Sequence, residues 1–199
     1  MRLTHCDSHF PHLVQFYHHQ PVLHFHTQNY DDQAWVALTW LRAAASVSAV
    51  LGDQTWRTKF VSRARWFYAL VRRGWDEKCC GGGMYWGRWS RYKNAVTSEL
   101  FVDLSGAVYE VTQESRDLEW AIRGWVWFRE SGMVNDQGLV NDGLTRDCRY
   151  PLSEQWLVGC VLWTLLTIGT TEKRHGLTTK ASFSPAYQNY TSTRPTPRS

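Results

Sequence analysis

The stretch YDDQAWVALTWLRA, residues 30–43, predicts an amphipathic helix whose first turn holds two adjacent aspartates. The pattern continues to residue 51 and ends at Gly52. Its apolar residues recur at helical spacing: Trp35, Leu38, Leu41 and Val50. Because like charges at neighbouring positions repel each other, Asp31 and Asp32 need an explanation of their own.

Three further helices follow along the chain. Asp53 caps a helix that ends at Gly74, residues 92–111 form the next helix, and Ser115 caps a last one through residue 128. The segment CCGGGMYWGRW, residues 79–89, is rich in glycine and aromatic residues and predicts a loop or short hairpin. Helix hairpins joined by short loops predict an all-α toroid or bundle.

The aspartate pair has a catalytic and a structural interpretation. Retaining glycosidases use one carboxylate as nucleophile and another as acid/base, about 5–5.5 Å apart. Neighbouring Cα atoms lie about 3.8 Å apart, so diverging side chains can reach that separation. A helix start favours an ionised nucleophile, whose charge raises the pKa of the partner, as a general acid requires. The alternative is one N-cap aspartate beside a solvated neighbour.

Composition and charge narrow the class of protein. The 199 residues suffice for one domain with a core, and the twelve tryptophans suit either core packing or stacking on sugars. The net charge of +4 comes from the chain ends, because residues 31–148 carry 15 Lys and Arg against 15 Asp and Glu. This neutral middle lacks the basic footprint of a nucleic-acid-binding protein, so we expect no nucleic-acid partner.

The cysteines and histidines predict no metal site, and we expect no cofactor. None of the five cysteines has CxxC spacing, and the adjacent Cys79 and Cys80 do not easily share one tetrahedral metal. A disulfide from Cys79 or Cys80 to Cys148 would suit a secreted protein, and free thiols are the alternative. The three glycines at 81–83 lack the pattern of a phosphate-binding loop.

Three motifs together resemble glycoside hydrolase family 76, which holds the endo-α-1,6-mannanases and their fungal cell-wall relatives. They cover essentially all of residues 29–148, in this order: YDDQAWVALTWLRA, CGGGMYWGRWSRYKNAVTSELFVDLSGAVYE and WVWFRESGMVNDQGLVNDGL. The resemblance implies an (α/α)6 barrel, with Asp31 as the retaining nucleophile and Asp32 as the acid/base. It also implies candidate sugar contacts at Trp35, Trp86, Lys93, Asn94, Asn141 and Asp142. The alternative is a structural role, with Trp86 in packing and residues 141–143 in a turn.

The resemblance divides the chain into a non-family segment (1–28), a partial glycosidase domain (29–148) and an aberrant tail (149–199). The family barrel needs more helices than residues 29–148 supply, so the domain is expected to be about half of the toroid. Codon choice permits residues 149–168 to be a translated intron. The next exon would then be read in the wrong frame, because a shifted frame at residues 175–182 encodes the family motif WTYNQG. A spliced transcript that still encodes the tail would contradict this.

The expected activity is retaining hydrolysis of α-1,6-mannan, in a form that is inactive or impaired. The alternatives are cell-wall transglycosylation with glycolipid-anchor mannose glycans, and a carbohydrate-binding helical fragment with a cleft lined by Trp35, Trp86 and Trp89. Half a barrel would expose apolar helix faces and favour aggregation. The family is typically secreted or cell-wall associated. The first ten residues lack the apolar stretch of a signal peptide, and the apolar run at 156–168 is too short to span a bilayer.

Overall fold

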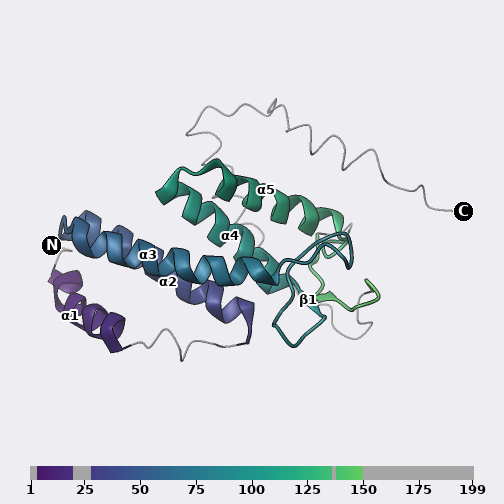
Figure 1. Cartoon of the computed structure of the whole chain (residues 1–199), viewed down its shortest axis with the longest axis horizontal. Coiled ribbons are helices and arrows are strands. Elements are labelled where there is room, and N and C mark those ends of the chain that lie inside the picture. Colours follow the sequence, from purple (N-terminus) through teal and green to yellow (C-terminus); the bar gives the residue numbers. More distant parts are fainter. Residues whose placement is uncertain (1–3, 20–27, 136–137, 150–199) are drawn as a thin grey trace, which may run out of the picture. The chain divides into compact units, whose positions relative to one another are not determined.

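The computed structural model describes residues 4–19, 28–135 and 138–149 (Figure 1). The chain divides into two units, residues 1–161 and 162–199, and every described residue belongs to the first. Of the predicted aberrant tail only Arg149 is described, so the intron and frameshift interpretation lies outside the described residues and stays a prediction.

The described residues form an all-α structure with one very small sheet, which confirms the predicted fold class. The helices are α1 (Thr4–His19), α2 (Tyr30–Val50), α3 (Gln54–Val71), α4 (Ala95–Thr112) and α5 (Ser115–Glu130), with a 3₁₀ turn η1 (Arg72–Gly74) after α3. The sheet pairs β1 (Lys93–Asn94) with β2 (Gly143–Leu144) in antiparallel register.

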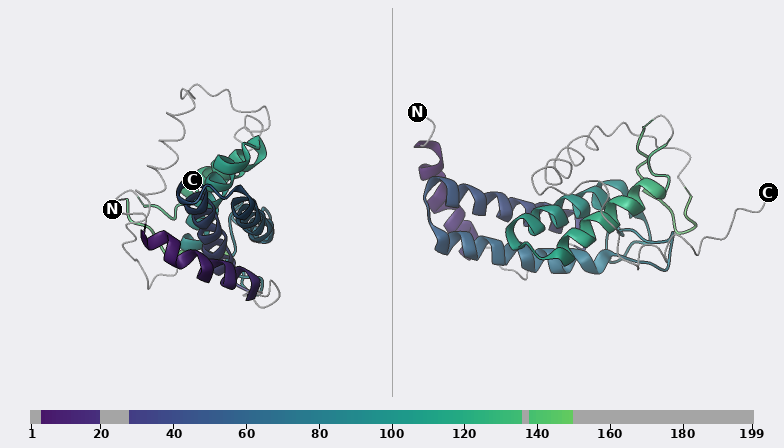
Figure 2. Two further views of the ribbon diagram at one scale, coloured as in Figure 1. Left: turned by 90° about the vertical axis from the view of Figure 1, so that its left-hand side faces the viewer. Right: turned by 90° about the horizontal axis from the view of Figure 1, so that it is seen from above.

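Helices α2 to α5 form two packed hairpins, α2 with α3 and α4 with α5 (Figure 2). The hairpins meet chiefly where α2 packs on α4, and both of these helices bury several apolar side chains in one core. Trp40 of α2, Phe60 of α3 and Phe101 of α4 are almost completely buried there. This arrangement fits part of the (α/α)6 barrel that the sequence predicts.

Helix α1 is a feature that the sequence patterns did not predict, because the segment has no clean periodicity and contains Pro11. Its aromatic side chains supply the contacts with the first hairpin. The Phe16 ring stacks on Trp40 at 5.7 Å between centroids, and the Tyr17 ring meets Trp56 edge-on at 5.5 Å. Helix α1 therefore has aromatic contacts with the first hairpin, although its sequence lacks the periodicity of an amphipathic helix.

Of the predicted helix caps, Asp53 is confirmed and Ser115 is wrong, and the predicted helix start at residue 92 is misplaced. The Asp53 carboxylate accepts a hydrogen bond from the Trp56 amide at 3.0 Å, as an N-cap should. The last helix is preceded by Glu114, which makes no side-chain cap bond, so Ser115 is not the cap. Helix α4 begins at Ala95 rather than at residue 92, because the preceding two residues pair with β2.

Helices α2 and α4 begin beside the same loop, which joins η1 to β1. The Tyr30 amide at the start of α2 donates to the Trp86 carbonyl at 2.8 Å, and the Trp86 amide donates to the Tyr92 carbonyl at 2.9 Å. The loop thereby brings two helix N-termini and the aspartate pair together. Among the described helices, none combines the length and apolar character needed to cross a membrane.

Candidate active site

The first turn of α2 presents both aspartates. Asn29 is the N-cap residue and makes no side-chain cap bond, whereas Asp31 and Asp32 lie inside the first turn. The alternative in which one of the aspartates is the N-cap is therefore wrong. The Asp31 carboxylate accepts a hydrogen bond from the Asp32 amide at 2.9 Å through Oδ1. Both carboxylates lie at the positive end of the helix dipole, where negative charge is stabilised.

Residues 86–89 run antiparallel to the segment that enters α2. Asn29 and Gly87 form an isolated bridge, and the Arg88 amide donates to the Gln28 carbonyl at 2.8 Å. This pairing places the Trp86 indole so that Nε1 donates to Asp31 Oδ2 at 3.0 Å. Each oxygen of the Asp31 carboxylate therefore accepts one hydrogen bond, and its orientation is fixed.

Asp32 is more exposed than its neighbour, and its pKa is raised above the ordinary value. Its side chain is exposed, whereas Asp31 is partly buried. Partial desolvation raises the pKa of Asp32, and the negative charge of Asp31 raises it further. Adjacent residues of a helix point about 100° apart, so the two carboxylates diverge from one edge of the helix. Asp31 is oriented by two donors, and Asp32 holds its proton more readily than an ordinary aspartate.

Three tryptophans lie near the pair in sequence or in space. Trp35, one turn after Asp31 on α2, is 50% exposed, and Trp89 is 59% exposed. Trp86 is partly buried, and its ring meets that of Trp89 edge-on at 5.1 Å between centroids. The Trp89 indole donates to Asn29 Oδ1 at 3.2 Å. Large exposed aromatic faces beside a carboxylate pair are suited to stacking on sugar rings.

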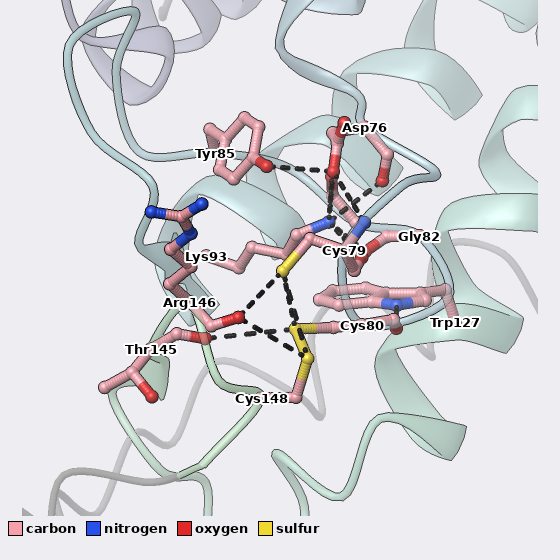
Figure 3. A network of polar contacts seen from close by, with 11 residues as sticks. Asp76, Cys79, Cys80, Gly82, Tyr85, Lys93, Trp127, Thr145, Arg146 and Cys148 are labelled. Atoms are coloured by element: carbon pink, nitrogen blue, oxygen red, sulfur yellow. Dashed lines mark hydrogen bonds and ion pairs between the residues drawn. A yellow bond between two sulfur atoms is a disulfide. The ribbon is translucent and has the colours of Figure 1, made fainter.

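Lys93 lies in a cage of oxygen atoms (Figure 3). Its ammonium donates to the carbonyls of Asp76 at 2.9 Å and Cys79 at 2.8 Å, as well as to that of Gly82, and it lies 3.5 Å from the Asp76 carboxylate. Burial lowers the pKa of Lys93, and the Asp76 charge opposes that change. The Lys93 side chain is 0% exposed, so it is placed to hold the 76–83 loop rather than to reach a sugar.

A disulfide closes the same loop against the segment after β2. Cys80 and Cys148 are bonded, with Cα atoms 5.3 Å apart, which selects one of the two pairings that the sequence left open. Cys79 is a free thiol whose Sγ lies 3.3 Å from Cys80 Sγ (Figure 3). Within the described residues, these three cysteines are the one cluster with metal-ligand spacing, and the disulfide occupies two of them.

The remaining predicted contacts gather around the small sheet. Asn94 caps α4, because its Oδ1 accepts from the Thr97 amide at 3.1 Å, and its Nδ2 donates to the Asp142 carbonyl at 3.2 Å. Asn141 is buried and bonds to Met133. Asp142 is partly buried, and its carboxylate accepts from the Tyr92 hydroxyl.

The structure therefore divides the predicted site residues into two groups. Asp31, Asp32 and Trp86 come together at the start of α2, with Trp35 one turn along the helix. Lys93, Asn94, Asn141 and Asp142 are engaged in contacts of the loop and the small sheet. Tyr92 was missed by the sequence analysis, although it stands beside Lys93 in the second motif. Its partner Asp142 lies 50 residues away, and that contact has no local signal.

Comparison with known proteins decides the family. The sequence profile of glycosyl hydrolase family 76 matches residues 14–162, three quarters of the chain. The chain belongs to this family. The match contains the predicted domain of residues 29–148 and extends beyond both of its ends. No curated protein matches significantly.

Solved structures share the fold, and those of one family 76 enzyme are among them. The GH76A α-1,6-mannanase of Salegentibacter sp. HEL1_6 aligns with a TM-score of 0.68 and 21% identity over 85% of this chain and 49% of its own. An inactive variant of that enzyme, with two consecutive aspartates replaced, was solved with α-1,6-mannotetrose. The Lin0763 protein of Listeria innocua is 28% identical over 73% of this chain and 41% of its own, with a TM-score of 0.59. The chain thus spans about half the length of these relatives.

Proposed function

We propose that the start of α2 is the catalytic site of a retaining glycosidase that cleaves α-1,6-mannosidic bonds. The observation that carries this proposal is the unequal aspartate pair. Asp31 is oriented by two N–H donors, and Asp32 is exposed with a raised pKa. Family membership supports glycosidase chemistry. The Salegentibacter relative is an α-1,6-mannanase whose doubly substituted aspartate variant is inactive, which supports both the substrate class and the choice of an adjacent pair.

In the first step, an Asp31 carboxylate oxygen attacks the anomeric carbon and forms a glycosyl ester. Asp32 gives its proton to the glycosidic oxygen as the bond to the leaving sugar breaks. In the second step, the Asp32 carboxylate takes a proton from water, and the oxygen of that water displaces Asp31 from the anomeric carbon. Two inversions give net retention. The raised pKa of Asp32 suits the acid, because the proton must be present when the leaving group departs.

The exposed aromatic residue of the same helix supplies the sugar contact in this proposal. Trp35 exposes half of its side chain one turn after Asp31, so its ring can lie against a pyranose face. Asp142 is a second candidate contact, because its carboxylate is partly exposed and is oriented by Tyr92. Lys93, Asn94 and Asn141 would act indirectly, by holding the loops that carry these groups.

The disulfide supports a location of the protein outside the reducing cytosol. Structural disulfides persist in oxidising compartments and are rare where thiols are kept reduced. The Cys80–Cys148 bond joins two segments that are 68 residues apart, and it closes the loop next to β1 and β2. We therefore place the protein among the secreted or surface-associated glycosidases. Three or fewer free thiols in the protein recovered from its native compartment would agree, since the chain has five cysteines and the disulfide occupies two of them. Five free thiols would contradict this placement.

The test is cleavage of α-1,6-mannotetrose by the purified chain, with products separated and identified by mass spectrometry. We expect cleavage that depends on both aspartates. Asp31→Asn and Asp32→Asn should abolish it. Asp53→Asn is the matched control, since it makes the same chemical change at the start of α3 and keeps a capping side chain. Cleavage that persists in either site variant, or sugar binding without any cleavage, would contradict the proposal.

The same assay separates hydrolysis from transfer. A glycosyl ester on Asp31 can be released by water or by the hydroxyl of an acceptor sugar, and the chemistry of the first step is identical. Addition of excess mannobiose should leave hydrolysis products predominant if water is the natural acceptor. Longer products formed only with the acceptor would reassign the reaction to transglycosylation while leaving the roles of both aspartates unchanged.

A further inference from the structure

The contact between Trp86 and Asp31 is specific in a way that aromatic packing alone would not require. The indole Nε1 is the one polar atom of the Trp86 side chain, and it donates to Asp31 Oδ2 at 3.0 Å. The other carboxylate oxygen accepts from the Asp32 amide at 2.9 Å. Rotation of the Asp31 carboxylate would break one of these bonds or both, so the indole and the helix backbone together fix the plane of the carboxylate.

The backbone of Trp86 is itself fixed on both sides. Its carbonyl accepts from the Tyr30 amide at 2.8 Å, and its amide donates to the Tyr92 carbonyl at 2.9 Å. Tyr30 immediately precedes Asp31. Trp86 therefore binds the start of α2 twice, through its main-chain carbonyl and through its indole. The indole is consequently positioned by the same pairing that positions the aspartate.

Gly87 allows the loop that carries Trp86 to lie close to the segment that enters α2. A Cβ atom at this residue would lie 2.8 Å from the Gln28 carbonyl oxygen and 3.0 Å from Asn29 Oδ1. Both distances are shorter than an ordinary van der Waals contact, and one of the atoms belongs to the backbone. A side chain at residue 87 would push the loop away from the segment entering α2, and the Trp86 indole would move with it.

We propose that Trp86 is a positioning residue for the nucleophile. Its indole N–H holds the Asp31 carboxylate in the orientation from which one oxygen attacks the anomeric carbon. This inference rests on the proposed function, and it replaces the role of sugar contact that the sequence predicted for Trp86. A sugar contact depends on the face of the ring, whereas a positioning role depends on the N–H group. Phenylalanine keeps an aromatic face and lacks the donor, so the two roles can be separated.

The kinetic test compares Trp86→Phe with the unaltered chain on α-1,6-mannotetrose. A hydrogen bond to a charged group that is lost from an otherwise intact site should lower kcat by about 10- to 100-fold. KM should stay unchanged, because an aromatic face remains for the substrate. Trp125→Phe is the matched control, since Trp125 is a partly buried tryptophan on α5, and it should leave both constants unchanged. A rise in KM with unchanged kcat would overturn the positioning role in favour of a sugar contact.

A second readout does not depend on turnover. The indole N–H proton of Trp86 gives an NMR resonance that is identified by its loss in Trp86→Phe. We expect Asp31→Ala to shift this resonance upfield, because the carboxylate acceptor is gone, while the same change at Asp53 should not move it. An unmoved resonance together with Asp31-dependent cleavage would overturn this inference and leave the proposed function standing. A moved resonance without Asp31-dependent cleavage would overturn the proposed function, and with it the catalytic meaning of the contact.

Discussion

The start of α2 and the loop around Lys93 both lie in family motifs, yet their charged side chains are arranged in opposite ways. At the start of α2, two like charges stand side by side, and one of them is exposed with a raised pKa. Around Lys93, one cation is completely buried and is surrounded by carbonyl oxygens and the Asp76 carboxylate. The first region keeps an unfavourable arrangement that a helix cap would not require, whereas the second pairs its buried cation with a carboxylate.

The difference agrees with the proposal that the start of α2 does chemistry, and it gives the Lys93 loop a structural role. Burial by itself would raise the pKa of Asp76, but hydrogen bonds from Tyr85 and the Cys79 amide, together with the Lys93 charge, lower it overall. Asp76 is thus stabilised as an anion in a folded loop. Asp32 is destabilised as an anion at an exposed helix start, which is the property that a general acid needs. Substitutions in the Lys93 loop should therefore cost stability, and those in the aspartate pair should cost activity.

The largest effect on stability is expected from Lys93→Met. Methionine fills much of the same volume but removes the cation beside the Asp76 carboxylate and the donor to several carbonyl oxygens. Removing one partner of a buried ion pair typically costs about 3–5 kcal/mol. Urea denaturation followed by tryptophan fluorescence measures the change, and Lys78→Met, at an exposed lysine of the same loop, is the control. Equal stabilities of the two variants would remove the structural role given to Lys93.

A slightly smaller effect is expected from loss of the disulfide. Cys148→Ser removes the bond to Cys80, and loss of a native disulfide costs about 2–5 kcal/mol because the unfolded chain gains freedom. Cys79→Ser is the matched control, because it alters the neighbouring free thiol and should change the free energy of unfolding by less than about 1 kcal/mol. The stabilities of the two variants are compared by thermal unfolding without reductant. A loss for Cys79→Ser equal to that for Cys148→Ser would mean that Cys79, not Cys80, is bonded to Cys148.

The smallest effect on stability is expected at the aspartate pair, and it has the opposite sign. Asp32→Asn removes a charge that is partly desolvated and repelled by Asp31, so the variant should be more stable at neutral pH, by less than about 1 kcal/mol. Asp32 has a raised pKa in the folded protein, so its charge costs stability as pH rises from its ordinary value of 3.8 through the raised one. The gain should therefore vanish below pH 3.8. A loss of stability at neutral pH would show that the Asp32 charge is structurally satisfied.

Local patterns predicted most of the helices because their signals lie within each segment. The first motif predicted a helix from residue 31 to 51, and α2 spans Tyr30–Val50. The start of α4 was misplaced by three residues, because the pairing of Lys93 and Asn94 with Gly143 and Leu144 joins segments 50 residues apart. No local window contains that information.

In the candidate site, too, the features that lie within one segment could be predicted and the long-range contacts could not. Adjacency of Asp31 and Asp32 is visible in the sequence, as is the family motif around them. The Trp86 indole bond to Asp31 joins residues 55 positions apart, and the burial of Lys93 depends on carbonyls from the glycine-rich loop. A lysine within a motif looks like a ligand contact until its surroundings are known, which is why Lys93 was predicted to contact sugar.

The most direct test of the account is to trap the glycosyl ester. A 2-deoxy-2-fluoro mannosyl donor with an activated leaving group allows the first step and slows the second, so a retaining enzyme accumulates its covalent intermediate. Peptide mapping by mass spectrometry should find the label on Asp31, in the peptide that spans residues 29–35, and Asp31→Asn should abolish it. A label on Asp32 or on any residue outside the start of α2, or no label in a chain that cleaves α-1,6-mannotetrose, would contradict the roles proposed for the pair.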